Sequence, residues 1–168
     1  MDTTHTADPA AQGDGLRGAE KKEAFHQAAE AGIHSFKLEV PDMDTQGKKV
    51  HIKLAGTDSC RAAVQVLRNG GENNLHYHSN GDSFWMVLKG RIRFYGPDDM
   101  VIGEYGPQEG LITPIWSRYW FENAGEEDAE ILHISARADS AIEHSGRTDL
   151  AEQRFRIGTT KHFDASKD

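Results

Sequence analysis

The sequence is poor in cysteine and in positive charge. Its single cysteine, Cys60, cannot form a disulfide within the chain and suits a reducing compartment. The 19 Lys and Arg residues are outnumbered by 27 Asp and Glu residues, which leaves a net charge of −8 at pH 7. Nucleic acids and anionic membranes attract clustered positive charge. We therefore expect neither of them to be the main partner.

A secretory leader and a long apolar run are also missing. The first nine residues contain no basic segment followed by an apolar one, so they do not resemble a signal peptide. No apolar stretch approaches the roughly 20 residues with which a helix crosses a bilayer. These two absences predict a cytoplasmic protein that does not enter a membrane.

The length and the local composition predict one folded domain with flanking segments. Residues 1–18 are small and polar, and we expect a disordered lead. Strong helix formers follow, with a glycine at their end, and predict an N-terminal helix over residues 19–33. Residues 34–137 carry the domain itself, and the polar residues 138–168 are expected to form a C-terminal arm or tail.

Within residues 34–137, apolar residues recur with a period of two, which predicts strands. The clearest sets are Phe36, Leu38 and Val40, then Val50, Ile52 and Leu54, then Ala62, Val64 and Val66. Gly-, Pro- and Asn-rich turns separate these short strands about every 8–12 residues, as in antiparallel sandwiches and barrels. The fold class is therefore predicted to be all-β.

Two histidines stand one residue apart in the middle of this pattern. His76 and His78 share one face of a predicted strand, because side chains alternate along a strand. Asp82 follows after a Ser-Asn-Gly turn. Imidazoles with a carboxylate are a ligand set that zinc, iron, manganese and nickel accept. The stretch therefore predicts a metal site on a β scaffold.

The same stretch resembles the cupin family. The first cupin motif spaces a Gly, a His-x-His pair, a Glu and a second Gly, and the second motif spaces a Pro, a Gly, a His and an Asn. The positions that fall in frame here are Gly70, His76, His78, Gly90, Pro114 and Asn123. The resemblance implies a single cupin barrel, which is a double-stranded β-helix or jelly roll.

This chain departs from the family pattern in both motifs. Counting back from Gly90 places Ser83 where the family has Glu, while the shorter forward spacing reaches Asp82. The carboxylate ligand is therefore either Asp82 or absent. Trp116 stands where a tight-turn Gly is expected, and Tyr119 stands where the third His ligand is expected.

The residue types suggest roles for these positions. His76, His78 and Asp82 would form a 2-His-1-carboxylate triad, which favours iron or manganese, with zinc or nickel possible. Tyr119 could bind the ion as a phenolate, but we favour a protonated hydroxyl that acts toward substrate as donor or general acid. His133, flanked by apolar residues, is either a substitute ligand or, as we favour, a hydrogen-bonded core histidine.

The resemblance implies a metal-dependent enzyme, with oxygenase among the activities it admits, that acts on a small organic molecule inside the barrel. One alternative is a non-catalytic binding module with a degenerate metal site. Another is a metal-free sugar isomerase or epimerase that uses His76 or Tyr119 as acid–base groups. Because an open sheet edge needs cover and the family commonly pairs barrels, we also expect a homodimer.

Overall fold

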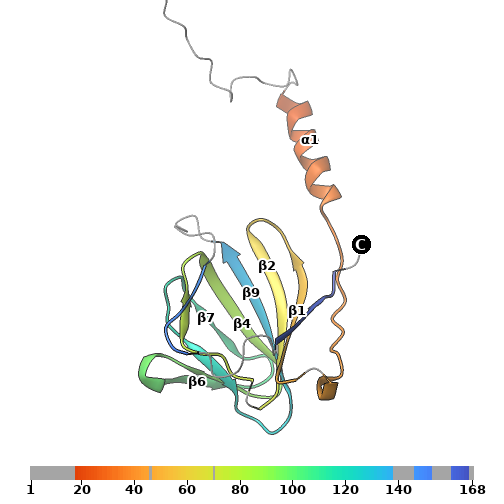
Figure 1. Cartoon of the computed structure of the whole chain (residues 1–168). Helices are drawn as coiled ribbons and strands as arrows, with labels where there is room; N and C mark the ends of the chain where they lie inside the picture. Colours follow the sequence, from red (N-terminus) through yellow and green to blue (C-terminus); the bar gives the residue numbers. More distant parts are fainter. Residues whose placement is uncertain (1–17, 46, 70, 138–145, 153–159, 167–168) are drawn as a thin grey trace, which may run out of the picture. The chain divides into compact units, whose positions relative to one another are not determined.

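The computed structural model describes residues 18–45, 47–69, 71–137, 146–152 and 160–166 (Figure 1). The chain divides into two compact units, Met1–His34 and Ser35–Asp168. The expected disordered lead, apart from its last residue, lies outside the described residues, as does Gly70 of the first motif.

The first unit contains one helix, α1, over Gly18–Ala31. It is rich in Ala, Glu, Lys and Gln, which have high helix propensity. The helix ends at Ala31, and the N–H of the next residue, Gly32, donates to the carbonyl oxygen of Ala29 over 3.0 Å. No helix among the described residues is both long and apolar enough to span a membrane.

The second unit is built from short strands. In the described residues these are β1 (Lys49–Gly56), β2 (Cys60–Leu67), β3 (His76–His78), β4 (Gly81–Lys89), β5 (Ile92–Tyr95), β6 (Val101–Tyr105), β7 (Gly110–Thr113), β8 (Trp120–Asn123), β9 (Ala129–Arg137), β10 (Arg147–Asp149) and β11 (Thr160–Asp164). Two single-turn 3₁₀ helices, Met43–Thr45 and Pro97–Asp99, lie in the connections.

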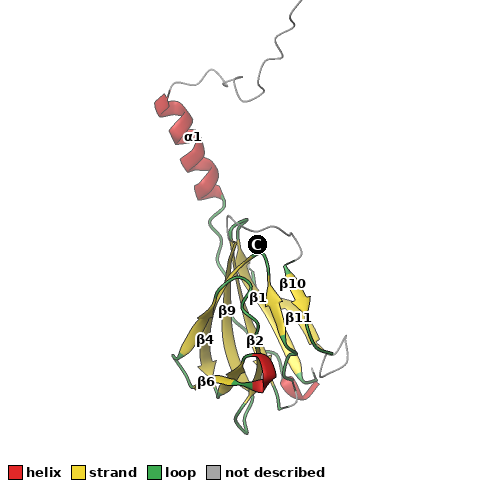
Figure 2. Ribbon diagram, turned by 90° about the vertical axis from the view of Figure 1, so that its left-hand side faces the viewer, coloured by secondary structure: helices red, strands yellow, loops and turns green. Residues whose placement is uncertain are grey.

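The strands form three sheets. The largest has six strands in the order β11-β1-β2-β9-β4-β7, and two smaller sheets have the orders β6-β5-β8 and β10-β3. All pairs are antiparallel except β1 with β11, which run parallel and lie side by side in Figure 2. The predicted fold class, an all-β barrel with a short N-terminal helix, is confirmed.

Two segments differ from what the sequence pattern predicts. Residues 36–40 do not form a strand: Phe36 makes only an isolated bridge to Ser166, while Leu38 packs onto a buried apolar cluster of the large sheet. The predicted arm, where it is described, contributes β10 and β11 to the sheets. The alternating pattern at residues 36–40 therefore does not lead to a strand, whereas residues 160–164 pair with the edge of β1.

The large sheet is apolar on both faces, and each face is buried against something different. On its outer face, Val50, Ile52 and Val64 pack with Leu38 and Met43 from the segment that precedes β1. On its inner face, residues of β4 and β9 pack with residues of β5 and β8. The buried members of this inner cluster are Leu67, Trp85, Val87, Ile92, Phe94, Tyr119, Phe121, Ala129 and Ile131.

The rest of the inner face is polar, and this is what positions the site. The buried or half-buried polar residues that share the inner face of the large sheet are Lys49, His51, Gln65, Ser83, Thr113, His133 and Ser135. Register explains the set, because Ser83 pairs with both Thr113 and Ser135, and Trp85 pairs with His133. The barrel interior is therefore apolar in one part and polar in another.

Candidate active site

The two predicted histidine ligands lie together inside the barrel. Both belong to β3, and their ring centroids are 5.2 Å apart. His76 is only 1% exposed, while His78 is half-buried. The Nδ1 of His76 lies 2.7 Å from the carbonyl oxygen of Asn74. Since a carbonyl can only accept, Nδ1 carries the proton in this bond, and Nε2 keeps a free lone pair.

The environment keeps both imidazoles neutral. Burial lowers the pKa of His76 to about 3 and the pKa of His78 to about 4, and the positive charge of Arg147 acts in the same direction. Arg147 pairs with His78 across β10 and β3, so its guanidinium is part of the same region. At neutral pH both rings are therefore acceptors with available lone pairs.

Tyr119, at the third ligand position of the family pattern, joins the two histidines. Its backbone exchanges two hydrogen bonds with His76, at 3.0 and 3.1 Å, and its ring centroid lies 4.6 Å from that of His76 and 6.4 Å from that of His78. The ring is 2% exposed. Its hydroxyl has no hydrogen-bond partner among the described residues.

Burial determines the ionisation of this phenol. It raises the pKa of Tyr119 to about 12, although Thr113, Ser83 and Trp85 lie near the hydroxyl and, with the charge of Arg147, oppose the rise. None of these three side chains meets the geometric criterion of a hydrogen bond to the hydroxyl. A phenolate ligand would need the pKa to move in the other direction. The hydroxyl is therefore protonated and can act only as a neutral hydrogen-bond donor or acceptor.

The structure does not bring Asp82 to the histidines. Asp82 is exposed on the outer face of β4, where its Oδ1 accepts a 2.8 Å hydrogen bond from the N–H of Ile115. The neighbouring Ser83 faces the interior instead and is 3% exposed. Because side chains alternate along a strand, only one of these two residues can face inward. Ser83 therefore occupies the inner position that the family pattern gives to Glu.

His133 points into the barrel and has a partner. Its Nε2 lies 2.9 Å from the Oγ of Ser83, and its ring stacks on Trp85 at a centroid distance of 3.9 Å. Burial lowers the pKa of His133 to about 3, and the nearby His78 acts in the same direction to a smaller extent. These contacts agree with a hydrogen-bonded core histidine, the role favoured from the sequence, rather than with a substitute ligand.

The described residues do not complete a metal site. No group of three His, Cys, Asp or Glu side chains among them is placed to hold an ion. His76 and His78 could supply two imidazole ligands, but Asp82 is on the other face of its strand and Tyr119 is an un-ionised phenol. The family's full ligand set therefore does not fit these residues.

Sequence reasoning missed the polar inner face of β1. Lys49 and His51 alternate with Val50 and Ile52, and the apolar set suggests the core-facing side. In the structure that apolar side is buried outside the barrel, so the polar side faces in. Lys49 lies over Phe121, with its Nζ 5.5 Å from the ring centroid, and burial followed by Arg147 lowers its pKa to about 7.

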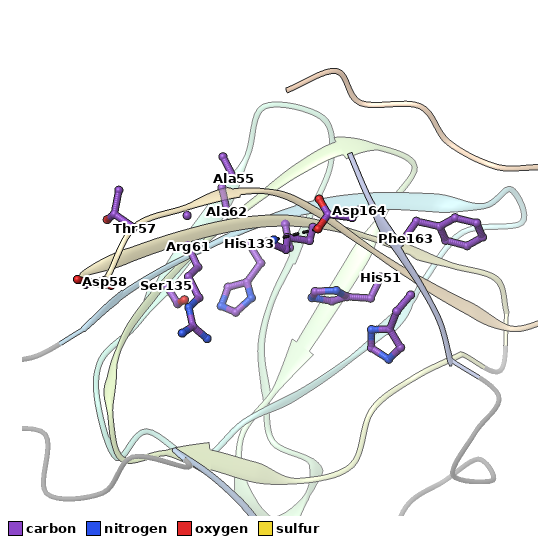
Figure 3. A pocket seen from close by; sticks show the side chains of 14 residues that line it. His51, Ala55, Thr57, Asp58, Arg61, Ala62, His133, Ser135, Phe163 and Asp164 are labelled. Atoms are coloured by element: carbon purple, nitrogen blue, oxygen red, sulfur yellow. Dashed lines mark hydrogen bonds and ion pairs between the residues drawn. The ribbon is translucent and has the colours of Figure 1, made fainter. Parts of the chain in front are cut away.

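A cavity of about 770 Å³ opens against this inner face. His51 and His133 project into it from two strands, together with Arg61 and Ser135 (Figure 3). His162, from a third strand, also lines it. The rings of His51 and His162 are 5.4 Å apart. The barrel thus offers room for a small molecule beside His51, His133 and His162, whereas His76, His78 and Tyr119 are not among the residues that line this cavity.

Comparison with known proteins agrees with this fold. Residues 63–135 match the family model described as Cupin domain. Polyketide synthase CurC of Streptomyces cyaneus is 31% identical over 87 residues, which make up 49% of this chain and 53% of that protein. The chain thus spans about half the length of this curated relative.

Two solved structures share the fold. A conserved protein with a double-stranded β-helix domain from Klebsiella pneumoniae has a TM-score of 0.53 at 16% identity, over 69% of this chain and 100% of that one. An RmlC-like cupin protein from Desulfovibrio desulfuricans has a TM-score of 0.50 at 24% identity, over 60% and 92%. These likenesses concern the fold alone. With the family match over residues 63–135, they show that this chain has the fold of a cupin domain, a double-stranded β-helix.

Proposed function

We propose that the barrel interior binds a small carbonyl-bearing molecule and moves protons on it without a resident metal. The observation that carries this proposal is the convergence of two neutral imidazoles and one unpartnered phenol hydroxyl on the same interior region. Such a set combines proton acceptors with a donor, which is what keto–enol chemistry needs.

The roles of Tyr119 and His78 follow from the protonation state of the first and the lower burial of the second. Tyr119 donates a hydrogen bond to the carbonyl oxygen, because its hydroxyl is protonated and has no other described partner. His78, which is less buried than His76, accepts a proton from the adjacent carbon. The C–H bond breaks, its proton passes to His78, and its electron pair moves to the carbonyl oxygen, which becomes an enolate held by the hydrogen bond from Tyr119. Return of a proton from His78 to the carbon restores the ketone, so no oxidant is consumed. The apolar part of the interior excludes water and strengthens both interactions.

The likeness to a polyketide synthase supports this choice of substrate class. A polyketide chain alternates carbonyl groups with methylene groups, and those methylene protons are acidic enough to be moved by a weak base. No group of three His, Cys, Asp or Glu side chains among the described residues is placed to hold an ion. We therefore derive no step through a metal, and the metal-dependent oxygenase expected from the sequence becomes the alternative that the experiments below can support.

The proposal is tested by following deuterium exchange at the methylene of 2,4-pentanedione by NMR. We expect the protein to accelerate exchange, and His78→Ala and Tyr119→Phe to lower the accelerated rate by about a hundredfold. Asp82→Ala is the matched control, because that carboxylate lies on the outer face of β4 and its loss leaves the interior intact. Unchanged rates in the first two variants, or an equal loss in the control, would contradict the proposal.

A further inference from the structure

Arg61 is a cation without a counter-ion at the cavity. It lies near the start of β2 and lines the cavity beside Ser135 and His133, toward the same side of the sheet as His51 (Figure 3). No hydrogen bond or ion pair joins it to any described residue. The other lining cation, Lys53, is paired with Asp164 at 2.9 Å. Arg61 therefore has its full set of guanidinium donors available.

A second unpartnered group lies on the same strand, beside the residues that line the cavity: Gln65 pairs with His51, which is one of them. Gln65 follows Arg61 by four residues, so it shares the inner face with it, and only the small side chain of Ala63 stands between them. Gln65 is 7% exposed, and its Oε1 has no hydrogen-bond partner among the described residues. Buried acceptors without a donor are rare in proteins, and a bound molecule is one way to supply the donor.

We propose that the cavity takes a small monocarboxylic acid, whose carboxylate pairs with Arg61 and whose hydroxyl group reaches Gln65. This rests on the proposed function and narrows its substrate class to keto or hydroxy acids. The planar guanidinium matches a carboxylate with two parallel hydrogen bonds. Asp58 and Asp164 also line the cavity, so a single negative charge suits it better than a phosphate dianion.

The spacing along β2 fixes how far apart the two polar groups of the acid lie. Four residues of strand separate the Cα atoms of Arg61 and Gln65 by about 13 Å. The hydroxyl therefore lies several bonds from the carboxylate, with apolar atoms facing Ala63.

The test compares two molecules of the same size that differ in charge. Acetoacetate and 2,4-pentanedione share a 1,3-dicarbonyl core, and a charged oxygen in the first replaces a methyl group in the second. We expect the protein to bind acetoacetate more tightly in NMR titrations. Arg61→Gln should lower the affinity for acetoacetate at least tenfold and leave that for 2,4-pentanedione unchanged. Since Arg61 is exposed and unpartnered, this variant should unfold at the wild-type temperature.

Lys161→Gln is the matched control. Lys161 lies on the neighbouring β11 in register with Val50, so it is on the outer face, and its substitution removes the same charge. If both variants lose the preference equally, or if Arg61→Gln keeps it, the proposal is overturned. The two claims can fail separately. If only this inference fails, the protein still accelerates deuterium exchange of 2,4-pentanedione, and His78→Ala still lowers that rate. If the proposed function fails, His78→Ala leaves the exchange rate unchanged.

A second pair of molecules tests the inner end. Hexanoate and 6-hydroxyhexanoate differ only in a hydroxyl group remote from the carboxylate. We expect the hydroxylated acid to bind more tightly, and Gln65→Leu to remove that advantage while Arg61→Gln weakens both acids. Equal binding of the two acids by the wild-type protein would overturn the assignment of Gln65.

Discussion

At the scale of single residues, the site depends on which groups are buried without a partner. Tyr119 is enclosed by Trp85, Phe94 and His76, and its hydroxyl has no described hydrogen-bond partner. A buried hydroxyl in this position costs free energy of folding, because it loses its hydrogen bonds to water on burial. Such a cost is tolerated where a ligand restores the bond.

This predicts a separation between stability and activity at Tyr119. We expect Tyr119→Phe to unfold at the same urea concentration as the wild type or at a higher one, because the substitution removes an unsatisfied polar group. The same variant should lose the accelerated exchange. A loss of about 1 kcal/mol or more in unfolding free energy would instead show that the hydroxyl makes a stabilising hydrogen bond in the free protein.

Residue-level patterns also show what could be predicted from the sequence. Strand alternation predicts that His76 and His78 lie on one face. The position of Tyr119 in the second cupin motif predicts that it lies near them. The same spacing could not choose between Asp82 and Ser83. That choice depends on the register of β4 with β7 and β9, which long-range pairing sets.

At the scale of elements, the large sheet has an uncovered apolar region. Phe84 pairs with Ile112 across β4 and β7, on the outer face, and these side chains are 41% and 62% exposed. The segment before β1 covers the other end of this face. The β7 strand is also an edge of the sheet. Exposed apolar residues beside a strand edge are typical of an interface.

We therefore keep the prediction of a homodimer and assign it to this region. Sedimentation equilibrium at micromolar concentration should give the mass of two chains for the wild type. Phe84→Asp together with Ile112→Asp should give the mass of one chain. Met100→Asp is the control, because Met100 is 64% exposed but lies outside the large sheet. A wild-type mass of one chain would exclude the dimer.

Element order explains where prediction from sequence fails. The turns and short strands from β1 to β9 follow from period-two patterns and from Gly and Pro positions. Nothing local indicates that Phe36 makes only a bridge, whereas residues 160–164 form a strand beside β1. The pattern also could not predict which side of β1 faces the barrel interior. Its apolar side is buried on the outer face instead, under the segment that precedes β1. Both depend on contacts between distant parts of the chain.

At the scale of the whole molecule, the buried histidines link folding to pH. The pKa values of His76 and His133 are about 3 and that of His78 is about 4, against an ordinary value of 6.5. Between about pH 6.5 and 4 the unfolded chain therefore binds more protons than the folded one. Stability must then fall as the pH falls through this range, by about 1.4 kcal/mol per histidine for each unit.

The measurement is the urea midpoint at pH 7, 6 and 5. We expect a steady decrease for the wild type and a shallower decrease for His133→Gln. His26→Gln, in the exposed helix α1, should follow the wild type. A midpoint that stays constant from pH 7 to 5 would show that the histidines are not buried in their neutral form.

The central claim is that the barrel interior moves protons without a resident metal. Metal content and exchange of 2,4-pentanedione, measured on one tag-free sample before and after chelation, test this most directly. We predict less than about a tenth of an equivalent of any transition metal and an exchange rate that chelation leaves unchanged. Near-stoichiometric metal, with exchange lost on chelation and restored by iron or manganese, would contradict the claim and support a metal centre at His76 and His78.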